Sequence, residues 1–206
     1  MAMTPMLYID AIEFRFGARL VFSGYCATLE PGITWLRAPN GKGKTTLLRL
    51  AAGALVPQKG SIRLDDVDCV RDPLAYRLQS FFCGGDLPEL PWLTVQELLD
   101  LHMDLYPGAD PAQVSQQLAA FDITEVLPQR LHALSLGQHK KVQLALALAL
   151  PVRLLLIDEP FNGLDSAAIS YLRAQLAARA AREDTCIVLT SHVEPGVPVR
   201  RTLDLA

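Results

Sequence analysis

The most constraining feature of the sequence is the glycine-rich stretch APNGKGKTT at residues 38–46. It follows ITWLR, an apolar run typical of a buried strand, and it continues into TTLLRLAAGAL, whose apolar residues recur at helical spacing. A strand, a glycine loop and a helix in this order are the context of the phosphate-binding pattern G-x-x-x-x-G-K-[ST]. Ala38 stands where that pattern begins with glycine. The sequence therefore predicts an α/β protein with a nucleotide-binding loop that departs from the pattern at one position.

Each residue of the loop has an expected role. Glycine adopts positive φ and lets backbone N–H groups approach an anion closely, and the following helix adds the dipole of its N-terminus. The residues expected to surround the phosphates are Asn40, Gly41, Lys42 and Gly43. Lys44 would reach the β- and γ-phosphates, Thr45 would bind Mg²⁺, and Thr46 would support the α-phosphate. Because alanine is small, we expect the loop to hold ATP with Mg²⁺ despite Ala38.

A second motif, LLLIDEP, places two carboxylates directly after a buried apolar run. Carboxylates at the carboxyl end of a parallel strand face the crevice in which open α/β sheets bind ligands. Asp158 is suited to hold Mg²⁺ through water, and Glu159 is suited to polarise a water molecule for attack on the γ-phosphate. Two adjacent acidic residues at the start of a loop would not by themselves indicate a function. In a chain that also carries a phosphate loop, they predict nucleotide hydrolysis.

The rest of the chain predicts an α/β core interrupted by helices. LYIDAIEF and RLVFSGYCATL read as strands, and residues 61–83 read as strands around a polar turn that end in SFFC. Gly53 is expected to stop the helix after the phosphate loop. A helix is expected near Ala167 to Ala181, followed by TCIVLTSH as the last core strand.

Between these strands, residues 94–150 read as mostly helical, with a break near Ala133. Thr94 and Glu97 have the spacing of a capping box, and Asp110 before a proline is a typical helix start. The apolar stretch LALALALPVRLLLI is shorter than the ~20 residues that a membrane span needs. It reads as the end of a buried helix, a turn and a buried strand.

Three short motifs complete an ordered set. LSLGQ begins at Leu134 and places serine and glycine at a helix start, FNGLD contains Asp165, and TSH ends in His192. In chain order the phosphate loop, LSLGQ, LLLIDEP, FNGLD and TSH resemble the nucleotide-binding subunit of ABC transporters over nearly the whole chain. The resemblance implies a P-loop NTPase fold of the ABC ATPase type. It would comprise a RecA-like core, an antiparallel β subdomain and an α-helical insert at about residues 87–150, within one domain spanning residues 1–206.

The resemblance also implies roles that the residues alone do not give. Two subunits would pair head to tail, with each ATP between one phosphate loop and the LSLGQ motif of the other subunit. Ser135, Gly137 and Gln138 would then contact the γ-phosphate held by the partner subunit. Asp165 would sit at the dimer seam. His192 would sense the γ-phosphate and hold the attacking water, or else be a structural histidine at a strand end.

Two further positions keep an alternative. Phe16, in FRFG, matches the family's aromatic residue that stacks on adenine, and a core phenylalanine is nearly as good a reading. Trp92 and Leu93 lie where a permease's coupling helix would dock, and both could instead be core residues of the insert.

The chain also departs from the family. Besides Ala38, Leu136 replaces the first glycine of LSGGQ. The glutamine that normally follows the strand before the insert is absent, because that position falls among Gly84, Gly85 and Asp86. We expect Asp86 or a water molecule to take the metal position. These departures are consistent with slow hydrolysis, but the carboxylates remain, so we expect an active ATPase.

The function implied is an ATP-hydrolysing subunit that powers a separately encoded permease, with export as the expected direction. LVFSG, GKGKTTLLRL, LSLGQ and DEPFNGLD look most like the haem-exporter ATPase of cytochrome c maturation. Two alternatives remain. One is an ABC-type ATPase unconnected with transport, acting on ribosomes or DNA. The other is a degenerate cassette that binds nucleotide as a regulatory partner.

Charge and leader signals bear on partners and location. The net charge of −3 does not favour nucleic-acid binding, so no nucleic-acid partner is expected. The first residues, MAMTPMLYIDAIEF, lack the pattern of a signal peptide. We expect a protein at the cytoplasmic face of the inner (plasma) membrane, held there through its permease, and paired with a second ATPase subunit as a homodimer or heterodimer.

Overall fold

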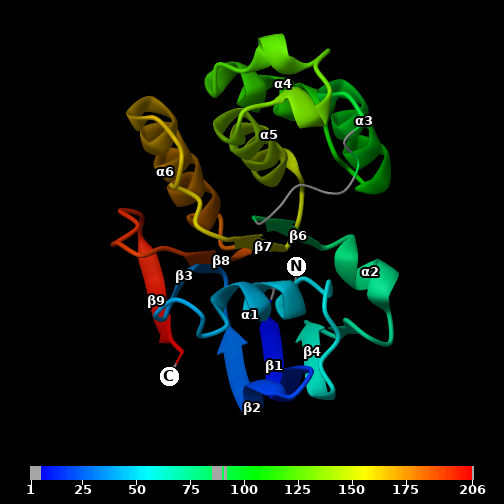
Figure 1. The fold of residues 1–206 in the computed structure, drawn as a ribbon, viewed down its shortest axis with the longest axis vertical. Helices are drawn as coiled ribbons and strands as arrows, with labels where there is room; N and C mark the ends of the chain where they lie inside the picture. The colour runs from blue at the N-terminus through cyan, green and yellow to red at the C-terminus, as the bar shows by residue number, and fades with distance from the viewer. Residues whose placement is uncertain (1–5, 85–89, 91, 206) are drawn as a thin grey trace.

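The computed structural model describes residues 6–84, 90 and 92–205. Two β-sheets and two groups of helices build the molecule (Figure 1). One sheet has four antiparallel strands in the order β2-β1-β4-β5: β1 (Leu7–Phe16), β2 (Arg19–Leu29), β4 (Lys59–Leu64) and β5 (Val67–Asp68). The other has five parallel strands in the order β6-β7-β8-β3-β9: β3 (Gly32–Arg37), β6 (Ser80–Cys83), β7 (Leu154–Ile157), β8 (Cys186–Thr190) and β9 (Val199–Asp204).

The helices cover the parallel sheet on both faces. They are α1 (Lys44–Ala51), α2 (Pro73–Arg77), α3 (Val95–Leu105), α4 (Pro111–Ala120), α5 (Leu136–Ala149) and α6 (Ser166–Ala180), with short 3₁₀ turns at Thr124–Val126 and Leu131–Ala133. Figure 1 shows α1 between the two sheets, and α3, α4 and α5 grouped on the opposite side of the parallel sheet. No helix in the described part of the chain is long and apolar enough to cross a bilayer.

Two apolar clusters explain this layering, and β7 belongs to both. Leu154 and Leu156 pack into the cluster around α1, whereas Leu155 and Ile157 pack into the cluster under the helices. All four side chains are fully buried. A central parallel strand is covered on both faces, which is why its sequence is an unbroken apolar run instead of an alternating one. The strand therefore delivers Asp158 to the carboxyl edge of the sheet, as predicted.

The predicted start and end of α1 are confirmed. Gly43, at φ 95°, precedes the helix, and a Cβ atom there would lie 2.8 Å from Val21 Cγ1. Gly53, at φ 68°, follows it and terminates it. The capping box of Thr94 and Glu97 and the cap at Asp110 are also confirmed.

Two elements differ from the sequence-based expectation. Residues 61–83 are not strands alone, because α2 interrupts them. The helix is a single turn whose Tyr76 is fully buried and donates a hydrogen bond of 2.6 Å to the Ala51 carbonyl. β8 is also not the last strand, because β9 follows it as a parallel edge strand beside β3. β9 is mostly exposed and reads VRRTLD, so it lacks the apolar pattern of a core strand.

Candidate functional site

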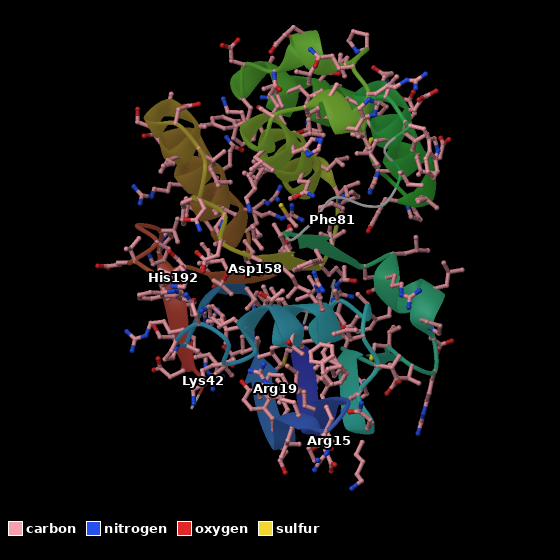
Figure 2. All side chains as sticks on the ribbon, in the orientation of Figure 1. Arg15, Arg19, Lys42, Phe81, Asp158 and His192 are labelled. Carbon is pink, nitrogen blue, oxygen red and sulfur yellow. The ribbon has the colours of Figure 1, made fainter. Side chains whose placement is uncertain are left out.

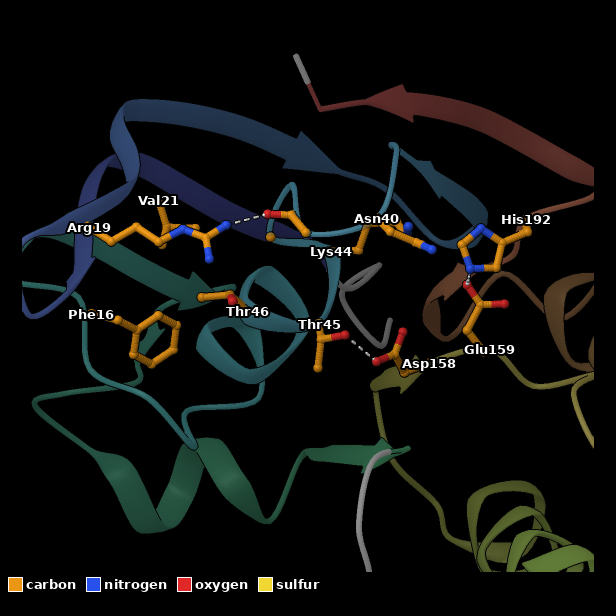
Figure 3. Close-up of a pocket in the computed structure, with 12 residues that line it drawn as sticks. Phe16, Arg19, Val21, Asn40, Lys44, Thr45, Thr46, Asp158, Glu159 and His192 are labelled. Atoms are coloured by element: carbon orange, nitrogen blue, oxygen red, sulfur yellow. Dashed lines mark hydrogen bonds and ion pairs between the residues drawn. The ribbon is translucent and has the colours of Figure 1, made fainter.

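The residues predicted around the nucleotide converge on one pocket of about 310 Å³. It lies where the loop before α1 faces the carboxyl ends of β7 and β8 (Figure 3). Its lining consists of Phe16, Arg19, Val21, Asn40, Gly41, Gly43, Lys44, Thr45, Thr46, Asp158, Glu159 and His192. In Figure 2, Asp158 and His192 lie between the α3–α5 helices and the antiparallel strands, while Arg15 and Arg19 lie with those strands.

Lys44 provides a buried positive charge beside the loop. Lys44 is only 8% exposed, and its Nζ donates a hydrogen bond of 2.7 Å to the Ala38 carbonyl. An ammonium group buried in this way is costly unless an anion or several acceptors face it. The contact uses the backbone oxygen of Ala38, which alanine offers as well as glycine does. The geometry is therefore compatible with the substitution at the first loop position.

Thr45 and Asp158 form the part of the pocket that could hold a metal ion. The Thr45 hydroxyl donates to Asp158 Oδ2 at 2.5 Å, so one hydroxyl and one carboxylate oxygen face each other at the start of α1 and the end of β7. Mg²⁺ prefers hard oxygen ligands, takes one or two from the protein and completes its shell with water and phosphate oxygens. These two side chains fit that requirement.

Glu159 is held in an unusual backbone conformation. Its φ of 48° lies in the left-handed region, which non-glycine residues adopt mainly where the surroundings impose it. Its Oε1 is buried without a hydrogen bond, and it lies 3.2 Å from His192 Nε2. A carboxylate beside an imidazole at the pocket suits a base that orients a water molecule.

Phe16 lies at the end of the pocket formed by β1 and β2. It is 52% exposed, and its ring is perpendicular to that of Phe14, with ring centroids 4.9 Å apart. The reading of Phe16 as a core residue is therefore wrong. Trp92 is 60% exposed, so it is not a core residue of the insert either, whereas Leu93 is partly buried and packs against the core.

Arg19 is a pocket residue that sequence reasoning missed. Its Nη2 donates to the Gly41 carbonyl at 2.8 Å, across 22 positions of sequence. Val21 lines the pocket beside it. Both belong to the strand-like stretch RLVFSG, and nothing in the local pattern links them to the loop. They reach it because β2 lies beside the loop in the fold.

The LSLGQ residues lie outside this pocket. Ser135 Oγ accepts a hydrogen bond from the Gln138 backbone, and Gln138 Oε1 accepts one from the Ser135 backbone, so the two form a capping box for α5. A Cβ atom placed on Gly137 would lie 3.3 Å from the Gly163 carbonyl oxygen, and Leu136 is 90% exposed. The Lys42 residue is exposed and is also not among the lining residues.

Asp165 connects α5 with α6. One of its oxygens accepts the Ala168 N–H and caps α6, and the other pairs with Lys141 of α5 at 2.8 Å. The Lys141 ammonium and the cap hydrogen bond lower the pKa of Asp165 below its ordinary value. The FNGLD loop is thereby attached to the helix that begins with LSLGQ.

Gly84 is one of the three positions at which the family's glutamine would be expected, and its surroundings leave no room for a side chain. It follows β6 at φ 152°, and a Cβ atom placed on it would lie 2.5 Å from Asp158 Cβ. No side chain can stand at residue 84 unless Asp158 moves. Gly85 and Asp86, the other positions considered, lie outside the described residues.

We therefore expect Gly84→Ala to impair Mg²⁺-dependent ATP hydrolysis and to destabilise the fold by about 1–3 kcal/mol, the usual cost of overpacking. Gly108→Ala is the matched control, because Gly108 also has a positive φ of 78° but has nothing within 4 Å of its Cβ position. Denaturant unfolding and phosphate release would be measured for both variants. Equal effects of the two substitutions would contradict the close approach at Asp158.

Comparisons with known proteins agree with this arrangement. Residues 27–162 match the family model described as ABC transporter. The chain is 34% identical to the cytochrome c biogenesis ATP-binding export protein CcmA of Paramagnetospirillum magneticum, over 92% of this chain and 88% of the relative. It is also 34% identical to the zinc import ATP-binding protein ZnuC of Yersinia enterocolitica, over 92% of this chain and 71% of the relative.

A solved structure of an ATP-binding subunit of an ABC transporter has the same fold. It superposes with a TM-score of 0.82 at 26% identity, covering 91% of this chain and 80% of that chain. The parallel core, the antiparallel sheet and the helices between β6 and β7 thus form the ABC type of P-loop NTPase fold. The chain belongs to the ABC transporter family, as an ATP-binding subunit with ATPase activity.

Proposed function

We propose that the chain hydrolyses Mg²⁺-ATP to power a separately encoded membrane permease that exports its substrate. The observation that carries this proposal is the convergence of Lys44, Thr45, Asp158, Glu159 and His192 on one pocket. These residues supply a cation for the phosphates, oxygen ligands for a metal and a carboxylate for a water molecule. The whole chain, residues 1–206, would act as a single cassette with its helical insert at about residues 87–150.

In this proposal the phosphate loop wraps the nucleotide. Lys44 leaves the Ala38 carbonyl for the β- and γ-phosphates, and Thr46 supports the α-phosphate. Bound between Thr45 and Asp158, Mg²⁺ would neutralise charge on the phosphate oxygens. Glu159 accepts a proton from the attacking water, and His192 holds that water and the γ-phosphate. The loop residues Asn40, Gly41, Lys42 and Gly43 offer backbone N–H groups.

The adenine end of the pocket is open to the aromatic ring of Phe16. Stacking on a ring face needs no hydrogen bonds and is compatible with a half-exposed phenylalanine. Phe16 would therefore cover the base, with Val21 at its edge.

A second subunit would complete the site. Within one chain, the LSLGQ helix start lies outside the pocket, and Leu136 is 90% exposed. In a head-to-tail dimer, the γ-phosphate of the partner's ATP would be contacted by Ser135, Gly137 and Gln138. Asp165, linked to α5 through Lys141, would lie at the seam.

Export is favoured over import by the extent of the likeness. The CcmA relative and the ZnuC relative are equally identical to the chain, but 88% of the former and 71% of the latter are covered. The chain would reach the cytoplasmic face of the membrane through its permease and take no nucleic-acid partner.

A cleft on the side of the helices fits the docking of that permease. Its volume is about 260 Å³, it lies between β6, α3 and α5, and most of its lining is apolar, including Phe81, Leu98 and Leu146. Figure 2 shows Phe81 between the strand layer and these helices. Arg49 of α1 reaches the cleft half-buried, and its guanidinium has no ion-pair or hydrogen-bond partner among the described residues. An apolar segment of the permease that carries a carboxylate would match both features.

The test is a pull-down from detergent-solubilised membranes with tagged Glu159→Gln, which should trap the ATP-bound dimer. Lys44→Ala serves as the control without nucleotide binding. Enrichment of a polytopic membrane protein with ATP, identified by mass spectrometry, is the expected result and would name the permease. Recovery of ribosomal or DNA-bound proteins without a membrane protein would contradict the proposal in favour of an ATPase unconnected with transport.

The docking surface is tested in the same experiment. Arg49→Glu should reduce recovery of the membrane protein at least tenfold, because a buried like charge would face its carboxylate. Arg63→Glu, on the antiparallel strand β4 over the Tyr8 ring, is the control and should not reduce it. ATP turnover of the isolated subunit should be unchanged by both substitutions. Undiminished recovery with Arg49→Glu would exclude this cleft.

A further inference from the structure

Thr190, at the end of β8, lies between the two carboxylate residues of the pocket without lining the pocket itself. Its hydroxyl donates to Asp158 Oδ1 at 2.6 Å and accepts the Glu159 backbone N–H at 2.8 Å. The residue is fully buried. One hydroxyl therefore uses its only proton on the Asp158 carboxylate and a lone pair on the Glu159 backbone.

The first of these bonds, with one from Thr45, fixes the Asp158 carboxylate from two sides. Thr45 donates to Oδ2 and Thr190 donates to Oδ1, so both oxygens have a hydroxyl partner. If a bound ion replaces the proton of Thr45 at Oδ2, Thr190 remains as the donor that keeps the carboxylate plane oriented. Ligands of a metal site commonly need such an outer hydrogen bond to hold their orientation.

The second bond stabilises a strained backbone. Glu159 has φ 48°, a strained conformation that persists only when its surroundings impose it. The Thr190 hydroxyl satisfies the N–H that this conformation directs toward β8. β7 and β8 are parallel neighbours with Ile157 opposite Leu189, so their ends lie side by side and His192 follows two residues after Thr190.

We propose that Thr190 is a positioning residue that orients Asp158 toward the metal and holds Glu159 in its left-handed conformation for hydrolysis. This inference rests on the Mg²⁺-dependent ATPase function proposed above. The Thr190 hydroxyl would align Asp158, the proposed metal ligand, with Glu159, the proposed base. A threonine that served packing alone would be replaceable by valine, which has the same shape but no hydroxyl.

Equilibrium ATP binding separates these cases, measured once with a chelator and once with Mg²⁺. For Thr190→Val, we expect ATP affinity in the chelator to stay within about twofold of the unmodified protein, because Lys44 and the loop are untouched. The gain in affinity that Mg²⁺ produces should fall about tenfold, the order expected for one hydrogen bond to a charged group. Turnover at saturating Mg²⁺ and ATP should also fall, because the Glu159 N–H loses its acceptor.

Thr190→Ser keeps the hydroxyl and should restore most of the Mg²⁺-dependent gain. The control is Thr34→Val. Thr34 is 3% exposed and lies on the neighbouring strand β3. Among the described residues, its side chain makes no hydrogen bond to Asp158 or Glu159. Thermal unfolding of each variant shows whether it is folded at the assay temperature.

The outcomes are distinct. A normal Mg²⁺-dependent gain in Thr190→Val overturns the positioning role, and so does a serine variant as impaired as the valine variant. If the unmodified protein itself gains no ATP affinity from Mg²⁺ and releases no phosphate, the proposed function fails instead.

Discussion

Glu159→Gln is expected to lower the turnover number for ATP hydrolysis about 10³-fold, within the range attributed to a positioned general base. The amide has the size of the carboxylate and keeps a contact with Asn162, but it cannot accept a proton. Its neutral side chain also loses the charge that faces His192 at 3.2 Å. ATP affinity should remain within a few-fold, because Lys44, Thr45 and Asp158 are unchanged. Steady-state phosphate release and equilibrium ATP binding measure the two quantities.

Two further variants make this result specific. Lys44→Ala should lose both binding and turnover, because it removes the buried cation proposed to bind the phosphates. Glu194→Gln, an exposed carboxylate two residues after His192, should lose neither. If Glu159→Gln kept full turnover, another group would have to accept the proton, and His192 would be the first to test. A dimer that accumulates with ATP in Glu159→Gln but not in Lys44→Ala would also support the head-to-tail arrangement.

The sequence predicts the parts of the site whose chemistry is local. A phosphate loop needs glycines, a lysine and a hydroxyl within a few residues, and the motif after β7 needs a buried strand directly before its carboxylates. Lys44, Thr45, Asp158 and Glu159 all satisfy such local rules, and the structure places them in one pocket.

The parts that sequence reasoning missed depend on which strands are neighbours. Arg19 reaches Gly41 only because β2 runs beside the loop, and Thr190 reaches Asp158 only because β8 lies beside β7. A threonine in CIVLTSH looks like any strand residue until the partner strand is known. β9 and α2 are missed from the sequence for the same reason. β9 carries two exposed arginines and is recognisable as an edge strand only beside β3. The single turn of α2 depends on the packing of Tyr76.

Arg179 shows a further long-range arrangement, this time for stability. The residue lies on α6, is 5% exposed, and its guanidinium donates hydrogen bonds to four carbonyl oxygens at the end of α5 and in the turn to β7. The acceptors are Ala147, Leu148, Leu150 and Val152, at 2.8 to 3.5 Å. Burial lowers the pKa of Arg179 to about 10, so the side chain is still charged at neutral pH. It satisfies carbonyls that a helix C-terminus leaves without partners.

Arg179→Ala is therefore expected to destabilise the protein by about 3 kcal/mol or more, because several buried carbonyls lose a charged donor at once. At this chain length that corresponds to a decrease in Tm of roughly 6–12 °C. Arg179→Lys should recover only part of the loss, since an ammonium lacks the planar fork that reaches several acceptors. Thermal and urea unfolding at neutral pH would measure both.

The control is Arg182→Ala, three residues along the same helix end, whose side chain is 59% exposed and pairs with Asp184 at 3.7 Å. An exposed pair of this kind contributes about 0–1 kcal/mol, so its loss should be barely measurable. A loss below about 1 kcal/mol for Arg179→Ala would mean that water replaces the guanidinium at the carbonyls. The expected loss of stability also concerns the nucleotide pocket. Val152 lies two residues before β7, and Asp158 and Glu159 directly follow that strand. Arg179 then fixes the point at which the chain returns from the helices to the strand that ends at Asp158.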